Sequence, residues 1–153
     1  MTLHLSFTST LPVEPECVWR WITDVRSLRA EMHPWLWMSI PKGVRNLEDL
    51  SVEPGKPLFI SWLWLFGILP IGISRLTLQS LTPGSGFVEQ SPMTGMRRWR
   101  HARRIEAVDG GTRVVDDLTI DPILPAVLVE PFLQLFFGSR HRTLRRRAAR
   151  QAH

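Results

Sequence analysis

The chain has few of the residues on which several classes of small protein depend. Cys17 is the only cysteine among 153 residues, which excludes a disulfide-stapled scaffold and a cysteine-ligated zinc or iron–sulfur site. Tyrosine is absent, so any acid–base chemistry would have to use His, Asp, Glu or Arg. Seven Trp and seven Phe, with 44% hydrophobic residues, exclude a disordered chain. The composition predicts a single domain over residues 1–153.

Long hydrophobic runs are also scarce. The one uncharged run, residues 58–74, contains Gly67, Pro70 and Gly72 and is shorter than the roughly 20 residues that span a bilayer, so we expect two apolar strands there. Residues 1–7 lack the charged stretch and apolar core of a secretory signal. Together with the single cysteine, this predicts a cytoplasmic protein.

Lysine is rare, and the basic charge is concentrated in two places. The net charge is +5, and only two of the 19 basic residues are lysines. Eleven arginines lie in residues 97–104 and 140–150, which contain no acid, so the rest of the chain has eight basic and 14 acidic residues. The protein is therefore an acidic body with two basic segments. We interpret residues 145–153 as a basic, frayed helix end that complements the helix dipole.

Hydrophobic periodicity predicts an α+β order of elements. Leu3, Leu5 and Phe7 alternate with polar residues, as in a half-buried strand, and Pro15 opens a short helix. Asp109-Gly110-Gly111-Thr112 is the clearest hairpin signal. Further ranges are a second short helix at 25–31, strands near 34–38, 58–66, 72–80, 87–91, 96–108 and 113–120, and a helix from about 125 to 149.

These elements predict a helix-grip fold: a curved antiparallel sheet of six to seven strands wrapped around a long C-terminal helix, with two short helices after the first strand. Only the last helix is long enough to cover the apolar face of such a sheet. A curved sheet does not touch one helix across its full width, so an apolar cavity is expected between them.

Four segments carry a resemblance to a known superfamily. They are residues 18–24, 99–101, 110–116 and 136–144, and with the order of elements they resemble the START-related helix-grip superfamily (SRPBCC), which includes polyketide cyclase/dehydrase-like proteins. The likeness spans essentially the whole chain and is nearest to small bacterial members. It implies a deep hydrophobic pocket between the sheet and the C-terminal helix, and it does not imply one reaction.

The strand at 96–108 holds the first candidate site residues. Period two places Trp99, His101 and Arg103 on one face, and Asp116 is the only charged residue on the apolar face of the following strand. A turn near Gly110 would bring these side chains together. Three interpretations stay open: an internal salt bridge, contacts to the polar end of a ligand, or an acid–base pair of His101 and Asp116.

The C-terminal helix supplies the other candidates. Phe132, Phe136 and Arg140 follow i, i+4 spacing, so Arg140 would close the pocket, toward Asp116 or Glu89. Trp62 and Trp64 are assigned to the pocket wall as well. The predicted ligand-binding residues are Trp62, Trp64, Trp99, His101, Arg103, Asp116, Phe132, Phe136 and Arg140.

The tryptophan-rich strands are apolar on both faces. Trp62, Trp64 and Phe66 alternate with residues that are also apolar, and the segment 35–37 repeats the pattern. Core packing with a few exposed apolar residues explains this in part. A homodimer contact or peripheral membrane contact through these strands would explain the rest.

The leading hypothesis is the binding or carriage of a hydrophobic small molecule, such as a lipid, isoprenoid or polyketide-like compound. The alternatives are a cyclase/dehydratase-type enzyme with His101 as base and Asp116 orienting it, and a module whose basic C-terminal helix contacts acidic membranes or, less in keeping with the acidic body, nucleic acid. No phosphate loop, nucleophile turn or metal-ligand spacing is present, so the sequence predicts no metal and no cofactor.

Overall fold

The computed structural model describes residues 2–151 and has two short helices, eight strands and one long C-terminal helix. The elements are β1 Leu3–Leu11, α1 Pro15–Thr23, α2 Val25–Met32, β2 Leu36–Met38, β3 Phe59–Leu65, β4 Leu69–Leu76, β5 Leu78–Thr82, β6 Gly86–Gln90, β7 Met96–Val108, β8 Gly111–Pro122 and α3 Ala126–Gln151, with a 3-10 turn at Leu47–Asp49.

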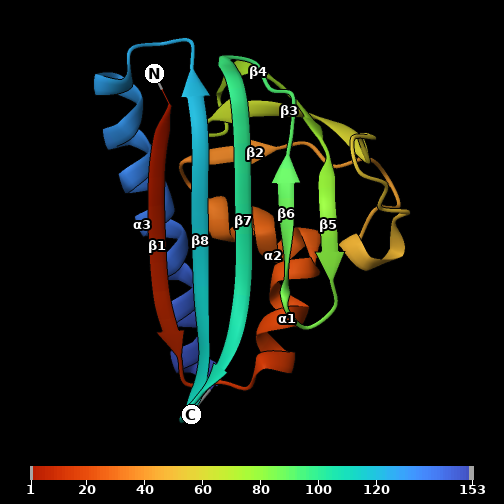
Figure 1. Cartoon of the computed structure of the whole chain (residues 1–153), viewed down its shortest axis with the longest axis vertical. Helices are drawn as coiled ribbons and strands as arrows, with labels where there is room; N and C mark the ends of the chain where they lie inside the picture. Colours follow the sequence, from red (N-terminus) through yellow and green to blue (C-terminus); the bar gives the residue numbers. More distant parts are fainter. Residues whose placement is uncertain (1, 152–153) are drawn as a thin grey trace.

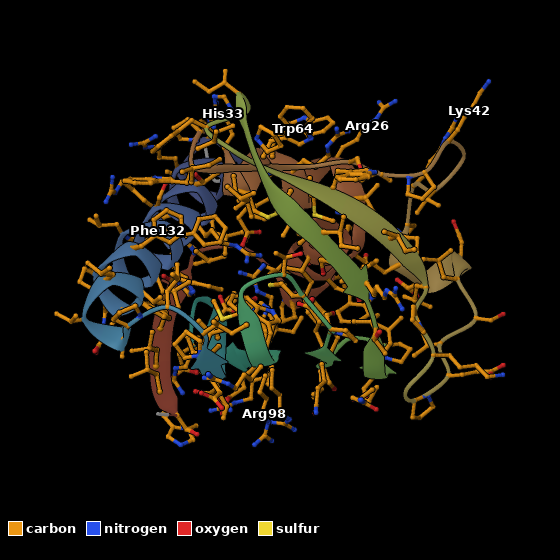
Figure 2. The ribbon with its side chains drawn as sticks, turned by 90° about the horizontal axis from the view of Figure 1, so that it is seen from above. Arg26, His33, Lys42, Trp64, Arg98 and Phe132 are labelled. Carbon is orange, nitrogen blue, oxygen red and sulfur yellow. The ribbon has the colours of Figure 1, made fainter. Side chains whose placement is uncertain are left out.

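The strands form two antiparallel sheets that face each other. One has the order β1-β8-β7-β6-β5, seen side by side in Figure 1 with α3 beside β1, and the other has the order β2-β3-β4. Seen from above, the three-stranded sheet lies across from the five-stranded one, and α3 runs along one side between them (Figure 2). This arrangement confirms the expected helix-grip fold.

The two short helices form because their ends are well specified. Pro15 opens α1, where its missing N–H costs nothing. Asp24 ends α1, and its side chain accepts a hydrogen bond of 2.9 Å from the backbone N–H of Arg26, which caps α2. α2 then packs against α3, so the chain after β1 returns to the C-terminal helix.

There is one strand more than the sequence predicted. The apolar stretch 72–80, expected as one strand, is divided at Thr77, which is buried and turns its hydroxyl to the carbonyl of Arg75 at 2.9 Å. β4 therefore pairs with β3, and β5 pairs with β6 in the other sheet. The division lets a continuous apolar stretch serve both sheets.

The basic C-terminal segment belongs to α3 as far as Gln151, and residues 152–153 lie outside the described part of the chain. Leu144 and Ala148 are buried against α1 and β8. Arg145 donates to the Ser9 hydroxyl and Arg147 to that of Ser27, both at 2.8 Å. The segment from 145 to 151 thus takes part in packing the helix against the body.

Candidate functional site

A cavity of about 450 Å³ lies between the two sheets, α2 and α3. Its wall is almost entirely apolar, with Leu63, Leu78 and Phe87 from the strands and Phe132 and Phe136 from α3. All four methionines of the described residues, Met32, Met38, Met93 and Met96, line it. Methionine side chains are flexible and polarizable, so such a wall adapts to ligands of different shape.

The cavity opens to the surface between β4 and the start of α3. Ile71, Leu124 and Leu128 line it and are nevertheless 42%, 61% and 64% exposed. The neighbouring Ile68 and Val127 are also exposed, at 79% and 76%. The mouth is therefore rimmed by apolar side chains, which favours passage of an apolar molecule.

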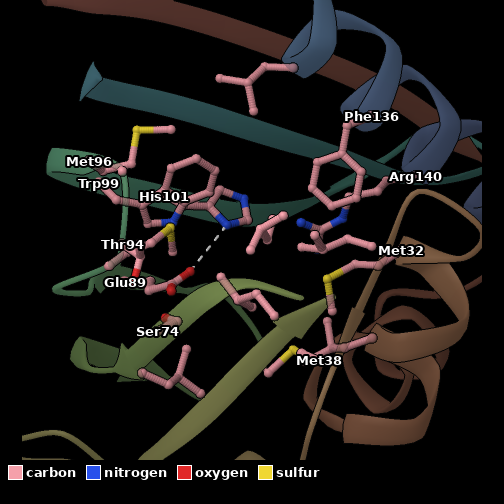
Figure 3. A pocket seen from close by; sticks show the side chains of 18 of the residues that line it. Met32, Met38, Ser74, Glu89, Thr94, Met96, Trp99, His101, Phe136 and Arg140 are labelled. Atoms are coloured by element: carbon pink, nitrogen blue, oxygen red, sulfur yellow. Dashed lines mark ion pairs between the residues drawn. The ribbon is translucent and has the colours of Figure 1, made fainter. Parts of the chain in front are cut away.

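Three charged groups face the cavity: Glu89, His101 and Arg140 (Figure 3). His101 Nδ1 lies 3.7 Å from Glu89 Oε1, and the other carboxylate oxygen of Glu89 accepts from the Ser91 hydroxyl at 2.7 Å. Arg140 Nε donates to Glu31 Oε1 at 2.9 Å. The polar part of the wall is thus a small charged patch in an otherwise apolar surface.

Asp116 organises the charges behind that patch. It is fully buried and accepts from His101 Nε2 at 2.6 Å and from His141 Nε2 at 2.7 Å. Arg103 donates to both of its oxygens, through Nε at 2.7 Å and Nη2 at 2.8 Å. Every lone-pair direction of this carboxylate is used, so it cannot also hold a ligand.

Glu31 on α2 is a second buried carboxylate and joins strand to helix. Arg103 Nη1 donates to its Oε2 at 2.9 Å, and Arg103 Nη2 also contacts its Oε1. Together with the bond from Arg140, this makes Arg103 the bridge between Asp116 and Glu31. α2, β7, β8 and α3 are held together through these four side chains.

The buried charged groups shift one another's pKa values. Burial alone would raise the pKa of Asp116, but Arg103 and His101 outweigh it and hold that pKa well below its ordinary range. The same balance, through Arg103 and Arg140, lowers the pKa of Glu31. Burial would lower the pKa of His101, but Asp116 and then Glu89 reverse this and raise it.

This geometry bears on the acid–base interpretation of His101. One ring nitrogen bonds to Asp116 and the other faces Glu89, so both are directed at carboxylates. The raised pKa of His101 favours the protonated ring. His101 lines the cavity, and its Nδ1 lies 3.7 Å from Glu89, beyond hydrogen-bond distance, so the acid–base pair of His101 and Asp116 stays a prediction.

Ser9, His141 and Asp116 form a chain that resembles a catalytic triad but does not reach the cavity. Ser9 Oγ lies 2.6 Å from His141 Nδ1, and Arg145 donates to the same hydroxyl. At the other end of the chain, His141 Nε2 lies 2.7 Å from Asp116 Oδ2. Because neither Ser9 nor His141 lines the cavity, the chain anchors α3 to β1 and β8.

Comparison with known families finds one family model that matches this chain. The model of the domain of unknown function DUF8410 matches residues 9–148, nearly the whole sequence. The chain belongs to the DUF8410 family. A search of curated proteins found no match to it.

Solved structures with the same fold cover this DUF8410 protein almost end to end. The Zhui aromatase/cyclase from Streptomyces sp. R1128 matches 100% of it and 97% of its own chain, with a TM-score of 0.73 and 12% identity. A START superfamily protein from Mycobacterium smegmatis (97% and 98%, TM-score 0.68, 12% identity) and Ara h 8.0201 (97% and 99%, TM-score 0.64, 14% identity) are also similar. At these identities the likeness establishes the START-related helix-grip fold.

Most of the predicted site residues of the DUF8410 protein lie at the cavity or directly behind it. Trp99, His101, Phe132, Phe136 and Arg140 line the cavity. Arg103 and Asp116 face inward, as period two predicted, but they lie behind the wall. Arg140 reaches neither Asp116 nor Glu89; its ion pair is with Glu31.

The assignment of Trp62 and Trp64 to the pocket is wrong. Trp62 is 58% exposed, and Figure 2 shows Trp64 on the outer side of the three-stranded sheet, whereas Phe132 points inward. On β3 it is Leu63 and Leu65 that line the cavity. Both faces of this strand are apolar, so the alternation contains no polar residue that would mark the outer side.

Sequence reasoning missed Glu31 and the methionine wall. Glu31 meets Arg103 and Arg140 across 72 and 109 residues of sequence, which no local pattern reveals. One signal was available: a single acid beside Met32 on the inward face of a short helix. Within residues 2–151 no group of His, Cys, Asp and Glu is arranged to hold a metal ion, and no helix there is long and apolar enough to cross a membrane.

Proposed function

We propose that this DUF8410 protein binds and carries a hydrophobic small molecule in the cavity between its sheets and α3. The observation that carries the proposal is the 450 Å³ cavity with an apolar wall, a methionine lining and an open, apolar mouth. Well-packed domains leave few voids larger than a water molecule, so a space of this size implies an occupant. The shared fold with a START superfamily protein and an aromatase/cyclase supports the same function.

Binding without turnover is favoured over cyclase or dehydratase chemistry. The histidine in the cavity wall, His101, bonds to Asp116 through Nε2 and directs Nδ1 at Glu89, and Asp116 behind it already accepts four hydrogen bonds. A lipid, an isoprenoid or a polyketide-like ring compound would each fit an apolar wall with one polar patch. We propose a molecule of this kind as the cargo.

Extraction of the purified protein tests the proposal. Organic extraction followed by mass spectrometry, with native mass spectrometry of the intact protein, should recover an apolar compound in stoichiometric amount. A preparation that carries no compound and does not bind an uncharged apolar dye would contradict the function.

A cavity-filling variant shows whether the compound occupies this space. Ser74 is buried in the cavity wall, so Ser74→Phe should fill part of the space and reduce binding of the apolar dye about tenfold or more while the protein stays folded. Ser80→Phe, the same change on an exposed position of β5, is the matched control and should bind as the wild type does.

A further inference from the structure

The polar patch of the cavity wall offers one donor group without an acceptor in the described part of the chain and one carboxylate with acceptor capacity left. Arg140 is nearly buried and uses only Nε, in its bond to Glu31; none of residues 2–151 accepts a hydrogen bond from its two terminal amino groups. Its guanidinium carbon lies 4.8 Å from the centroid of Phe137, which holds the group in place. The terminal N–H groups are therefore available to an acceptor in the cavity.

The acceptor is the Oε1 oxygen of Glu89. Ser91 donates to the other oxygen, the Trp99 indole also interacts with this carboxylate, and the 3.7 Å between Oε1 and His101 Nδ1 is longer than a hydrogen bond. A carboxylate can accept about four hydrogen bonds, so acceptor capacity is left. Oε1 can therefore accept a hydroxyl group from a bound molecule. Figure 3 shows Glu89 and Arg140 on different sides of His101, and all three residues line the same cavity.

The cations at the patch already face carboxylates. Arg140 pairs with Glu31 at 2.9 Å, and His101 lies between Asp116 at 2.6 Å and Glu89 at 3.7 Å. A ligand carboxylate would have to share Arg140 with Glu31 and would lie in the same patch as the Glu89 carboxylate, and a ligand amine would lie near the Arg140 guanidinium. Either head would meet a like charge at a largely buried site, which disfavours it.

We infer that the ligand of this cavity is a neutral amphiphile whose polar end presents an acceptor oxygen to Arg140 and a hydroxyl group to Glu89. This rests on the proposed function and specifies the molecule that the cavity selects: a hydroxylated ester, ketone or similar neutral head on an apolar body. Free fatty acids and aliphatic amines of the same length are selected against.

Three ligands with one common tail test the inference. Monolaurin, laurate and dodecylamine share a twelve-carbon chain and differ in head charge, and their affinities can be measured below their micellar concentrations at pH 6 by displacement of an uncharged apolar dye. Monolaurin should bind at least about tenfold more tightly than either charged ligand, the factor expected for one unpaired charge at a partly solvated site. Equal or tighter binding of laurate overturns the inference.

Two changes that each remove one charge from the patch sharpen the test. Glu89→Gln removes one negative charge and should raise the affinity for laurate about tenfold while lowering that for monolaurin. Arg140→Gln should weaken the binding of monolaurin about tenfold more than it weakens the binding of the dye. Glu106→Gln and Arg104→Gln, on the outer face of β7, are matched controls and should change nothing.

The outcomes separate the inference from the proposed function. If the dye binds but monolaurin does not, or if Glu89→Gln leaves the preference between laurate and monolaurin unaltered, the inferred head chemistry is wrong and the cavity still binds apolar molecules. If the wild-type protein binds neither the dye nor any of the three ligands, both fail. Circular dichroism and unfolding curves of each variant confirm that a lost affinity is not a lost fold.

Discussion

Asp116 accepts four hydrogen bonds from three buried side chains, and each of those side chains carries a donor that would otherwise lack a partner. A buried ion pair gives little net stability relative to an apolar core, but removing one member leaves the others unpaired. The Asp116 carboxylate is therefore needed as the counter-charge of the buried Arg103 guanidinium, and the two residues contribute to stability as a pair.

Asp116→Asn should destabilise the protein by about 3–5 kcal/mol, because it leaves the buried guanidinium of Arg103 without its full counter-charge. Urea unfolding followed by tryptophan fluorescence measures this. Asp117→Asn is the matched control on the next residue, whose carboxylate pairs with Arg104 at the surface, and should change stability by less than about 0.5 kcal/mol. Similar losses of unfolding free energy in the two variants would contradict the claim that Asp116 is the counter-charge on which the buried network depends.

The pH dependence of stability follows from the directions of the pKa shifts. Burial opposes ionisation of Glu31 and Asp116, but their arginine partners lower both pKa values, so their contribution is present above the ordinary values near 4 and is lost as the pH falls below them. His101 has the opposite sign: its pKa is raised, so its contribution is complete below the ordinary value of 6.5 and is lost as the pH rises through the raised pKa.

The urea midpoint should therefore be highest between about pH 5 and 6.5 and fall on both sides. Unfolding curves at intervals from pH 4 to 9 measure this. In His101→Gln the decline on the alkaline side should become shallower, and the decline on the acidic side should remain. A midpoint that rises steadily from pH 6 to 9 in the wild type would show that His101 is not held as the cation.

At the scale of elements, two glycines are placed for different reasons. Gly111 begins β8 where a Cβ atom would collide with the backbone carbonyl of Leu11, so a side chain there forces β1 and β8 apart. Gly138 lies inside α3 with no atom near the position of a Cβ, and glycine there only lowers the helix propensity.

Gly111→Ala should therefore destabilise the protein by about 1–3 kcal/mol, and Gly138→Ala should stabilise it by roughly 0.5–1 kcal/mol. Thermal unfolding of the two variants beside the wild type checks both signs in one experiment. A stabilising effect of Gly111→Ala would mean that the close approach of β1 at this turn is not needed for the fold.

Hydrophobic periodicity in the sequence identified the inward faces of some elements and not of others. Period two identified the inward face of β7, because its polar and apolar sides differ, and helical spacing placed Phe132, Phe136 and Arg140 on one side of α3. The same reasoning failed on β3, where both faces are apolar and the chain shifts register after Leu63. Contacts between distant elements, such as Glu31 with Arg140, arise only when the chain is folded.

At the scale of the whole molecule, part of the basic charge is internal or locally paired. Arg103 and Arg140 serve the buried network, and Arg104 pairs with Glu106 and Asp117 on the outer side of β7. Arg147 stacks on Trp21 at 4.6 Å. A high isoelectric point therefore gives weak support to a nucleic-acid surface, because these four arginines already have partners within the fold.

The outer side of the three-stranded sheet is an exposed apolar surface. This tryptophan face consists of Trp37, Ile60, Trp62, Trp64 and Ile73 on β2, β3 and β4, and Trp37, Ile60 and Trp62 are 42%, 52% and 58% exposed. Aromatic side chains dominate interfaces because they bury much area at little entropic cost. The homodimer expected from the sequence would cover this face with the same face of a second copy.

Sedimentation equilibrium at micromolar concentrations should then show a dimer. Trp62→Ser combined with Ile60→Ser should weaken the dimer about a hundredfold or more, since two central apolar side chains leave the interface. Leu128→Ser, an equally exposed apolar residue at the cavity mouth, is the control and should leave the mass unchanged. If the wild type stays monomeric and instead binds phospholipid vesicles in a manner that depends on Trp62, the tryptophan face meets a membrane, and the dimer is wrong.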